Sequence, residues 1–472
     1  MRRKNPLNQF FNAQSIAVIG VSRNERKPGH IVARNLVEKF FGDIFLVSTS
    51  GVKELLGRRV YQNVVEIEDI VDLAVILVPA PVVPEILRDC AKKRIRNVII
   101  SAGGFAETGA QGEKLQEELD TVIQESRIRV IGPNCIGVYS PLTGLDTMFI
   151  PVEKLQRPGP GHVSFLTQSG AYGVAFLNKL SLLGYGRWIS KFVSFGNAID
   201  INEMTILQYL GEDDQTKVIF AYLEGFKNGR DFMRCAKGIR KPLIVIKAGR
   251  TAAGSKASFS HTGSLSANDN VVDDLFQQSR IIRANNWEAG LDLVKLFAMQ
   301  PPPRGRKVAV LTDGGGAGVM MSDAIALEGL TLATLAEETT EALQKVYPPY
   351  YIVENPVDLT GSVQAQDFIV GLETLMEDPN VDAVVLIAIP APALEVQALV
   401  EGLHPLVSEA EKTVVGLSFG GVEAEIITTK LEKLGIPTYS EEYRAVRALR
   451  VYADYATNHT NTDLAQLGIP PS

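Results

Sequence analysis

The stretch Ser15-Ile-Ala-Val-Ile-Gly-Val-Ser22 reads as a buried strand followed at once by a glycine turn and a hydroxyl group. In a Rossmann fold the phosphates of a ligand lie at this junction, against the N-terminus of the first helix. The loop continues with the cations Arg23, Arg26 and Lys27, without a complete G-x-G-x-x-G pattern. The second expected strand ends at Val47-Ser48-Thr49, without the acidic residue that binds an NAD ribose. The junction therefore favours a ligand with several phosphates, such as coenzyme A, and the alternative is a solvated basic loop.

Outward from this junction, short apolar runs alternate with longer helical patterns, as in parallel βαβ units. Breaks rich in proline and glycine at 156–161 and 301–305 separate three such series. The sequence therefore predicts an α/β protein with three consecutive doubly wound domains, at 1–150, 158–300 and 305–472. The expected strands are 15–20, 44–47, 73–78, 97–101 and 128–131, then 162–166, 188–193, 218–222 and 243–246, then 308–312, 383–389 and 413–417.

The composition limits the class of protein. With 472 residues the chain is too long for one hydrophobic core. A formal charge of −7 and a pI near 5.5 argue against a nucleic-acid-binding protein. Cys90, Cys135 and Cys235 lack the spacing of a zinc site or a disulfide framework, which favours a reducing cytoplasm and no metal site. We find no signal peptide and no apolar run of membrane-spanning length, so we expect no membrane contact.

One segment has an unusual composition. From Thr251 to Ala267 nearly every residue is Gly, Ala, Ser or Thr, and the exception that carries chemistry is His261. The segment is expected to be a loop between the strand at 242–247 and a helix that begins near Asp269. Small residues let backbone N–H groups surround an anion, and an imidazole there can take and return a phosphoryl group. The alternative is a flexible loop with a solvated histidine.

A set of short motifs in a specific order identifies a family. The chain resembles the α subunits of the ADP-forming (NDP-forming) acyl-CoA synthetases, relatives of succinyl-CoA synthetase. This resemblance implies a Rossmann CoA-binding domain followed by two flavodoxin-like ligase domains. It also implies a separate ATP-grasp β subunit as the partner of this chain. The motifs are Ala17–Ser22, 132–137, 167–171, 222–225, 247–249, 260–264, 355–358, 435–437 and 444–447.

The resemblance also implies the site residues. His261 becomes the phosphorylated histidine, and Glu224 the carboxylate that fixes its tautomer. Phosphate or acyl phosphate would be bound at a helix that begins after Ser169, although this serine is equally suited to an ordinary N-cap. The implied phosphate-binding residues are Gln168, Ser169, Gly170, Ser260, Thr262 and Gly263. The implied CoA contacts are Gly20, Ser22, Arg23 and Lys27, with Pro79, Gly103, Asn134 and Cys135 along the other strand ends.

The implied reaction converts acyl-CoA, phosphate and ADP reversibly into a carboxylic acid, CoA and ATP, through an acyl phosphate and phosphohistidine. Mg²⁺ would accompany ADP or ATP on the β subunit of an α₂β₂ assembly, and the histidine loop is expected to move. Two alternatives remain: a transferase of the same fold for carbamoyl or acyl phosphate, and a catalytically silent CoA-binding regulatory protein. The sequence leaves open the acyl group, the choice between ADP and GDP, and the physiological direction.

Three positions depart from the family pattern. Tyr172 follows Ser-Gly-Ala where a smaller or aliphatic residue is commoner, so the acyl pocket is expected to differ in size or polarity. Asp313 lies in a Gly-rich turn, 312–318, where the family usually has asparagine. The run 48–50 lacks the customary Asn-Pro. These departures are expected to change specificity more than reaction type.

Overall fold

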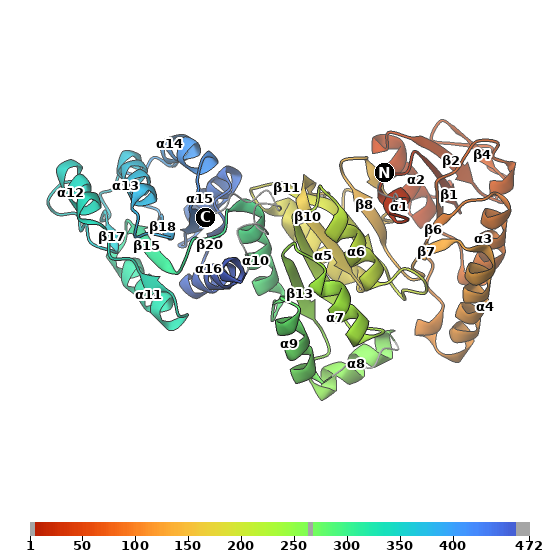
Figure 1. Ribbon diagram of the computed structural model, residues 1–472. Coiled ribbons are helices and arrows are strands. Elements are labelled where there is room, and N and C mark those ends of the chain that lie inside the picture. Colours follow the sequence, from red (N-terminus) through yellow and green to blue (C-terminus); the bar gives the residue numbers. More distant parts are fainter. Residues whose placement is uncertain (1–4, 263–267, 459–472) are drawn as a thin grey trace. The chain divides into compact units, whose positions relative to one another are not determined.

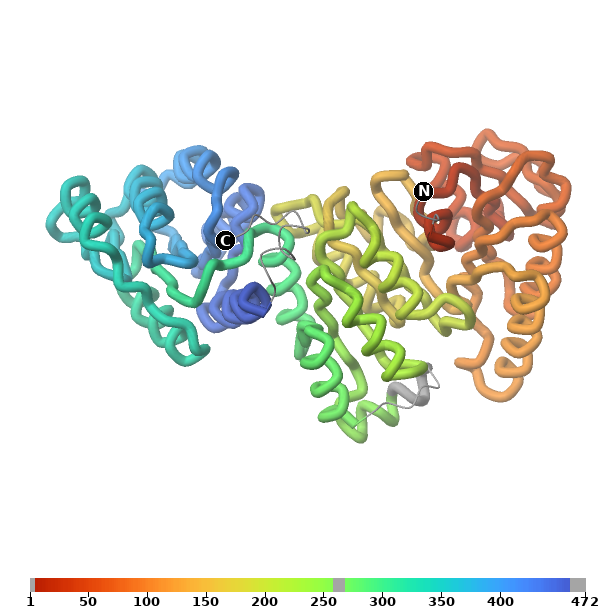
Figure 2. The backbone as a smooth tube through the Cα atoms, in the orientation of Figure 1, coloured from red at the N-terminus to blue at the C-terminus, as the bar shows by residue number. Residues whose placement is uncertain are grey.

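The computed structural model describes residues 5–262 and 268–458, without the side chains of 258–262. Figure 2 follows the chain from red at the N-terminus to blue at the C-terminus. The strands of the described residues form three sheets. The helices and strands form two compact units, one of residues 1–181 and 187–283 and one of 182–186 and 284–472. The predicted domain boundaries stay a prediction. No helix in the described ranges is both long and apolar enough to cross a bilayer.

The first sheet has the strand order β3-β4-β2-β1-β5-β6-β7, with β1 parallel to both of its neighbours (Figure 1). Its strands are β1 (Ser15–Ile19), β2 (Asp43–Val47), β3 (Glu54–Leu55), β4 (Arg58–Tyr61), β5 (Leu73–Ile76), β6 (Asn97–Ile100) and β7 (Arg129–Ile131). Its helices are α1 (Asn8–Phe11), α2 (Pro28–Lys39), α3 (Val83–Lys92) and α4 (Ala110–Ser126), with 3₁₀ turns η1 (Val64–Glu66), η2 (Ala80–Val82) and η3 (Ala106–Thr108).

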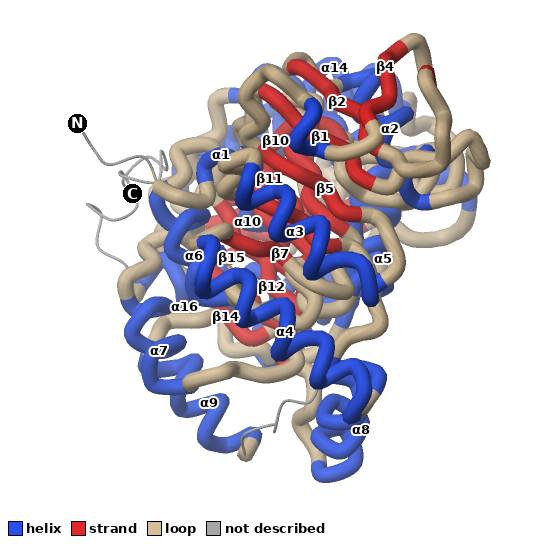
Figure 3. The backbone as a smooth tube through the Cα atoms, turned by 90° about the vertical axis from the view of Figure 1, so that its right-hand side faces the viewer, coloured by secondary structure: helices blue, strands red, loops and turns tan. Residues whose placement is uncertain are grey.

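Both faces of this sheet are buried, which explains why its strands are apolar throughout. Ile16 and Val18 of β1 belong to a core that includes Val32 and Leu36 of α2. Ala17 and Ile19 of β1 belong to a second core, together with residues of α3 and α4. These two helices lie next to one another over the strands (Figure 3). The first sheet is therefore doubly wound, as predicted.

The second sheet has the order β14-β13-β12-β10-β11-β8-β9, and β8 pairs antiparallel with β11. Its strands are β8 (Gly137–Ser140), β9 (Leu145–Asp146), β10 (Gly159–Thr167), β11 (Arg187–Ser194), β12 (Val218–Leu223), β13 (Leu243–Lys247) and β14 (Ile282–Arg283). Its helices are α5 (Gly170–Leu182), α6 (Glu203–Glu212), α7 (Gly229–Lys237), α8 (Ala252–Thr262) and α9 (Asp269–Gln278). Residues 159–161, expected in a linker, are the start of β10, which is a correction to the sequence prediction.

The third sheet has the order β16-β15-β18-β19-β20, and β17 also pairs with β15. Its strands are β15 (Lys307–Thr312), β16 (Thr331–Leu332), β17 (Val357–Asp358), β18 (Ala383–Ile387), β19 (Thr413–Leu417) and β20 (Thr438–Tyr439). The helices of this unit are α10 (Trp287–Met299), α11 (Gly315–Leu327), α12 (Glu337–Val346), α13 (Ala365–Glu377), α14 (Val396–Ser408), α15 (Val422–Leu434) and α16 (Glu442–Thr457).

The segment that contains His261 is not a loop as far as it is described, because Ala252 to Thr262 form α8. The loop prediction is therefore wrong for these residues. The prediction counted Ala252, Ala253 and Ala257 only as small residues, although alanine is the strongest helix former.

Candidate functional site

A cavity of about 470 Å³ lies at the carboxyl edge of the first sheet. Four of the predicted CoA contacts line it: Gly20, Ser22, Lys27 and Pro79. Gly20 has φ +101°, and a Cβ there would lie 2.6 Å from the carbonyl oxygen of Leu77. Only glycine fits this close turn, which lets the loop backbone approach a ligand. The cavity is thus where the strand-and-glycine pattern predicted a phosphate-bearing ligand.

His30 supports the same loop, whereas the sequence favours a helix-capping or solvated side chain at this position. It is buried at the start of α2, and its Nδ1 lies 2.8 Å from the carbonyl oxygen of Ser22. The ring therefore fixes the backbone beside Ser22. A histidine two residues after the proline that opens a helix was the available signal. Arg23 does not line the cavity.

The remaining predicted CoA residues form a second group, at the ends of β6 and β7. Asn134 has φ +58° and follows a cis Gly132–Pro133 bond. A Cβ on Gly103 would lie 3.3 Å from Oδ1 of Asn134. Cys135 is buried, its Sγ donates to the carbonyl of Ile100 at 3.4 Å, and burial raises the pKa of the thiol to about 12. The Cys135 thiol therefore faces the core and stays protonated.

A second site is built where β10 meets α5. Thr167 ends the strand, and its Oγ1 donates to the carbonyl of Ser169 at 2.8 Å. Gly170 begins the helix, and a Cβ there would lie 2.5 Å from Cγ1 of Ile136. Ser169 Oγ accepts from the N–H of Tyr172 at 3.4 Å, so this serine caps the first turn of α5. The helix dipole at this N-terminus favours an anion.

Gln168 connects this helix start to the end of β12. Its Oε1 accepts from the backbone N–H of Glu224 and from that of Gly225, the latter at 3.2 Å. The Gln168 amide nitrogen is the group that remains to face a ligand, because the oxygen is used by the backbone. Glu224 is buried, with 5% of its surface exposed. Three of the predicted residues, Gln168, Ser169 and Glu224, are thus brought together by adjacent strand ends.

A stacked aromatic pair borders this site. Tyr172, in the first turn of α5, and Tyr222, at the end of β12, have ring centroids 4.1 Å apart and ring planes inclined by 25°. Burial raises the pKa of both phenols, and that of Tyr222 is further raised by the charge of Glu224. Both hydroxyl groups therefore stay protonated, and the departure at Tyr172 places bulk beside the helix N-terminus.

The two ends of the segment that contains His261 are tied together. Nε of Arg250, before α8, lies 3.0 Å from Oδ2 of Asp269, the first residue of α9. Arg283 of β14 pairs with Asp269 and with Asp273. α8 packs against η3 of the first domain. The side chains of Ser260, His261 and Thr262, and all of Gly263, lie outside the described residues.

The third sheet has a related edge. Thr312 ends β15, and its Oγ1 donates to the carbonyl of Gly314 at 3.1 Å. Both carboxylate oxygens of Asp313 accept from the N–H of Ile389, at 3.0 and 3.1 Å. Burial, with a smaller contribution from the charge of Asp358, raises the pKa of Asp313 to about 7.

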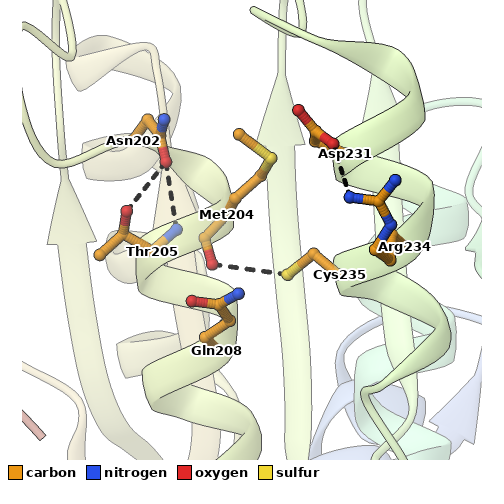
Figure 4. A pocket seen from close by; sticks show the side chains of 7 residues that line it. All are labelled: Asn202, Met204, Thr205, Gln208, Asp231, Arg234 and Cys235. Carbon is orange, nitrogen blue, oxygen red and sulfur yellow. Dashed lines mark hydrogen bonds and ion pairs between the residues drawn. The ribbon is translucent and has the colours of Figure 1, made fainter.

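A shallow groove of about 360 Å³ lies elsewhere on the second domain, between α6 and α7 (Figure 4). It contains none of the predicted site residues. Within it the Cys235 thiol donates to the carbonyl of Met204 at 3.5 Å, and burial raises the pKa of this thiol to about 11. The groove therefore offers no reactive thiolate.

Comparison with known proteins identifies the family. Family models match in the order of the three sheets: a CoA binding domain over 14–141, a succinyl-CoA ligase like flavodoxin domain over 160–297 and a ligase-CoA domain over 308–459. The chain is 37% identical to the α subunit of ADP-forming acetate–CoA ligase II of Pyrococcus furiosus, over 96% of this chain and 98% of the relative. The chain belongs to the family of ADP-forming acetate–CoA ligase α subunits.

Other members of the acetate–CoA ligase family agree. A solved structure of the dinucleotide forming acetyl-coenzyme A synthetase 1 of Candidatus Korarchaeum cryptofilum, in complex with phosphate and ADP, matches with a TM-score of 0.88 and 32% identity over 98% of both chains. The ADP-forming acetate–CoA ligase I of Archaeoglobus fulgidus is 36% identical over 95% of this chain, and the match covers 64% of that relative. These findings confirm the predicted family and the three-domain α/β fold.

Proposed function

We propose that this chain is the α subunit of an ADP-forming acyl-CoA ligase, acting through an acyl phosphate and a phosphohistidine at His261. The observation that carries the proposal is the meeting of Gln168, Glu224 and the N-terminus of α5 at neighbouring strand ends. These groups suit a reaction in which a phosphoryl anion is bound and passed to an imidazole. The cytoplasmic location inferred from the cysteines belongs to the same proposal.

The reaction proceeds in three transfers. A phosphate oxygen attacks the thioester carbonyl of acyl-CoA, the C–S bond breaks, and CoA leaves as its thiolate. A neutral ring nitrogen of His261 then attacks phosphorus, the P–O bond to the acyl group breaks, and the carboxylate leaves. Finally a terminal oxygen of ADP takes the phosphoryl group from His261, which returns to neutral imidazole.

The residues of this chain supply positioning and charge. The N–H groups of α5 and the amide nitrogen of Gln168 would hold the phosphoryl oxygens, where the helix dipole opposes their charge. Glu224 would accept from one nitrogen of His261 and stabilise the cationic phosphoimidazole. CoA would lie with its phosphates at Ser22 and Lys27 in the first-domain cavity.

The nucleotide is assigned to a partner. The Archaeoglobus relative extends well beyond its match to this chain, which covers 64% of it. We propose that a separate ATP-grasp β subunit binds the nucleotide, with Mg²⁺ beside it, in an α₂β₂ assembly. This subunit would correspond to the additional length of the Archaeoglobus relative. The acyl group is that of a small carboxylic acid.

The test measures the transfer of ³²P from ATP to this chain. The purified chain is mixed with its β subunit, Mg²⁺ and [γ-³²P]ATP, beside His261→Ala and a matched His404→Ala variant, whose histidine is exposed on α14. We expect acid-labile, base-stable label on the native chain and on His404→Ala, and none on His261→Ala. Equal label on His261→Ala would place the phosphorylated residue elsewhere in the chain and contradict the role of His261. No label on the native chain, beside a partner that binds nucleotide, would leave a CoA-binding regulatory protein instead.

A further inference from the structure

Lys247 is a buried cation at the carboxyl end of β13. Its Nζ donates to the backbone carbonyl of Glu224 at 2.7 Å and to that of Ala248. The ammonium also lies 5.7 Å from the ring centroid of Phe226. Two of the three N–H donors thus bond main-chain carbonyls, one just after β12 and one just after β13.

These bonds complete a fixed geometry around one residue. Gln168, from the end of β10, accepts from the N–H of Glu224, while Lys247, from the end of β13, donates to its carbonyl. The peptide groups on both sides of the Glu224 side chain are therefore held by side chains from the two strands that flank β12. The Cα of Glu224, from which the carboxylate extends, is therefore held in place by both neighbouring strands.

The charge of Lys247 is costly in this place. Burial, with a smaller contribution from the charge of Arg283 on β14, lowers the pKa of the ammonium to about 8, while the charges of Asp269 on α9 and of Glu224 oppose the shift. Arg250, in the loop after β13, is paired with Asp269. The two bonds to main-chain carbonyls and the nearby carboxylates compensate for part of this cost.

We propose that Lys247 is a positioning residue for phosphoryl transfer: its protonated ammonium holds the Glu224 main chain, and through it the carboxylate that orients His261. The inference rests on the proposed function, because it acts through Glu224. Loss of the Lys247 proton weakens the bond to the Glu224 carbonyl, and the transfer rate then falls as the pH rises through about 8.

The chain contains a matched control at the other end of the same strand. Lys241, just before β13, has its Nζ donating to the carbonyls of Leu210, at 2.8 Å, and Asp213. Burial lowers its pKa to about 8 as well, with Asp213 and Asp214 opposing the shift and Lys191 adding to it. Lys241 therefore resembles Lys247 in bonding and titration but lies at the amino end of the parallel strands, away from Glu224.

The experiment measures single-turnover phosphorylation of the native chain, Lys247→Met, Lys247→Arg and Lys241→Met, each with the β subunit, from about pH 6.5 to 9.5. We expect Lys247→Met to lose about ten- to a hundredfold in rate. Lys247→Arg should recover most of the rate and keep it above pH 8, because a guanidinium stays protonated. Lys241→Met should keep both the native rate and its decline above pH 8.

Each other outcome overturns a distinct statement. If the native chain takes no label, the proposed function fails and this inference with it. If the native chain is labelled and Lys247→Met keeps its rate within about twofold, or loses no more than Lys241→Met, only the role of Lys247 fails. Should Lys247→Met not fold, an unchanged alkaline decline in Lys247→Arg contradicts the inference by itself.

Discussion

The carboxyl edges of the second and third sheets share a turn of similar construction, and the side chain after the threonine decides what each edge can donate. In each, a strand ends in threonine, at Thr167 and Thr312, and a helix begins three residues later, at Gly170 and Gly315. Each threonine hydroxyl donates to the carbonyl two residues on. The two turns therefore present helix N-termini of the same construction.

The residue after the threonine is Gln168 in one turn and Asp313 in the other. Both accept from main-chain N–H groups at the end of a neighbouring strand. Glutamine does this with its oxygen and keeps an NH₂ group to offer to an anion, whereas aspartate has oxygens alone. The second edge can therefore donate a hydrogen bond through Gln168, whereas the third edge is neutral at this position only when Asp313 is protonated.

The largest expected effect comes from making the second edge like the third. In Gln168→Glu a carboxylate oxygen can still accept from Glu224 and Gly225, but the donor is lost and a negative charge faces the phosphoryl group. We expect phosphorylation of His261 to slow by about a hundredfold or more. Gln208→Glu, exposed on α6, adds the same charge elsewhere in the domain and should keep the native rate. Equal rates for both variants would contradict the comparison.

The reverse change, Asp313→Asn, should increase the stability of the folded chain at alkaline pH. The pKa of Asp313 is raised from 3.8 to about 7, so the folded chain binds the extra proton between these values and loses stability as the pH rises through about 7. Asparagine removes that loss. We expect a gain of about 1–3 kcal/mol at pH 8 and little change at pH 4, or about 2–4 °C per kcal/mol in thermal unfolding.

The control for this change is Asp323→Asn, on the exposed side of the neighbouring helix α11. It removes one charge from the same domain and should leave the transition unchanged at both pH values. A gain for Asp313→Asn that is as large at pH 4 as at pH 8 would show that the effect does not arise from titration.

The smallest effect concerns the glycines six residues after each threonine. A Cβ on Gly173 would lie 2.8 Å from Cγ2 of Thr167 and 2.9 Å from the ring of Phe192. A Cβ on Gly318 would lie 3.2 Å from Cγ2 of Thr312. Overpacking makes Gly173→Ala cost about 1–3 kcal/mol, whereas Gly318→Ala stays within about 1 kcal/mol because helix propensity offsets the tighter contact. Urea unfolding that ranks them in the opposite order would refute this.

Much of the fold could be predicted because the central strands are buried on both faces. Runs such as 73–78 and 383–389 are apolar without interruption, and they coincide with β5 and β18. Short strands such as β8 and β16 were not predicted. Two to four residues of mixed polarity become a strand only through their pairing partner, which the local sequence does not contain.

The candidate site was predicted in part for the same reason. Gln168, Ser169 and Glu224 follow apolar strands, and parallel strands collect their carboxyl ends at one edge. Lys247 lies in one of the family motifs, but the sequence predicts no role for it. Its bond to Glu224 depends on β13 lying beside β12. The raised pKa of Asp313 depends on burial in the same way. Local sequence patterns do not predict side-chain contacts that depend on the order of the strands in a sheet.

The pairing of β8 with β11 has a consequence for dissecting this protein. Val138 and Tyr139 precede the second domain in sequence, yet they are in register with Val193 and Phe192 of its sheet. A fragment that ends at residue 150 would include the β8–β9 hairpin and leave β11 with an unpaired edge, which promotes aggregation. The same geometry makes fragment 1–150 a strand donor, so the two halves, expressed together, should reassemble as a split protein.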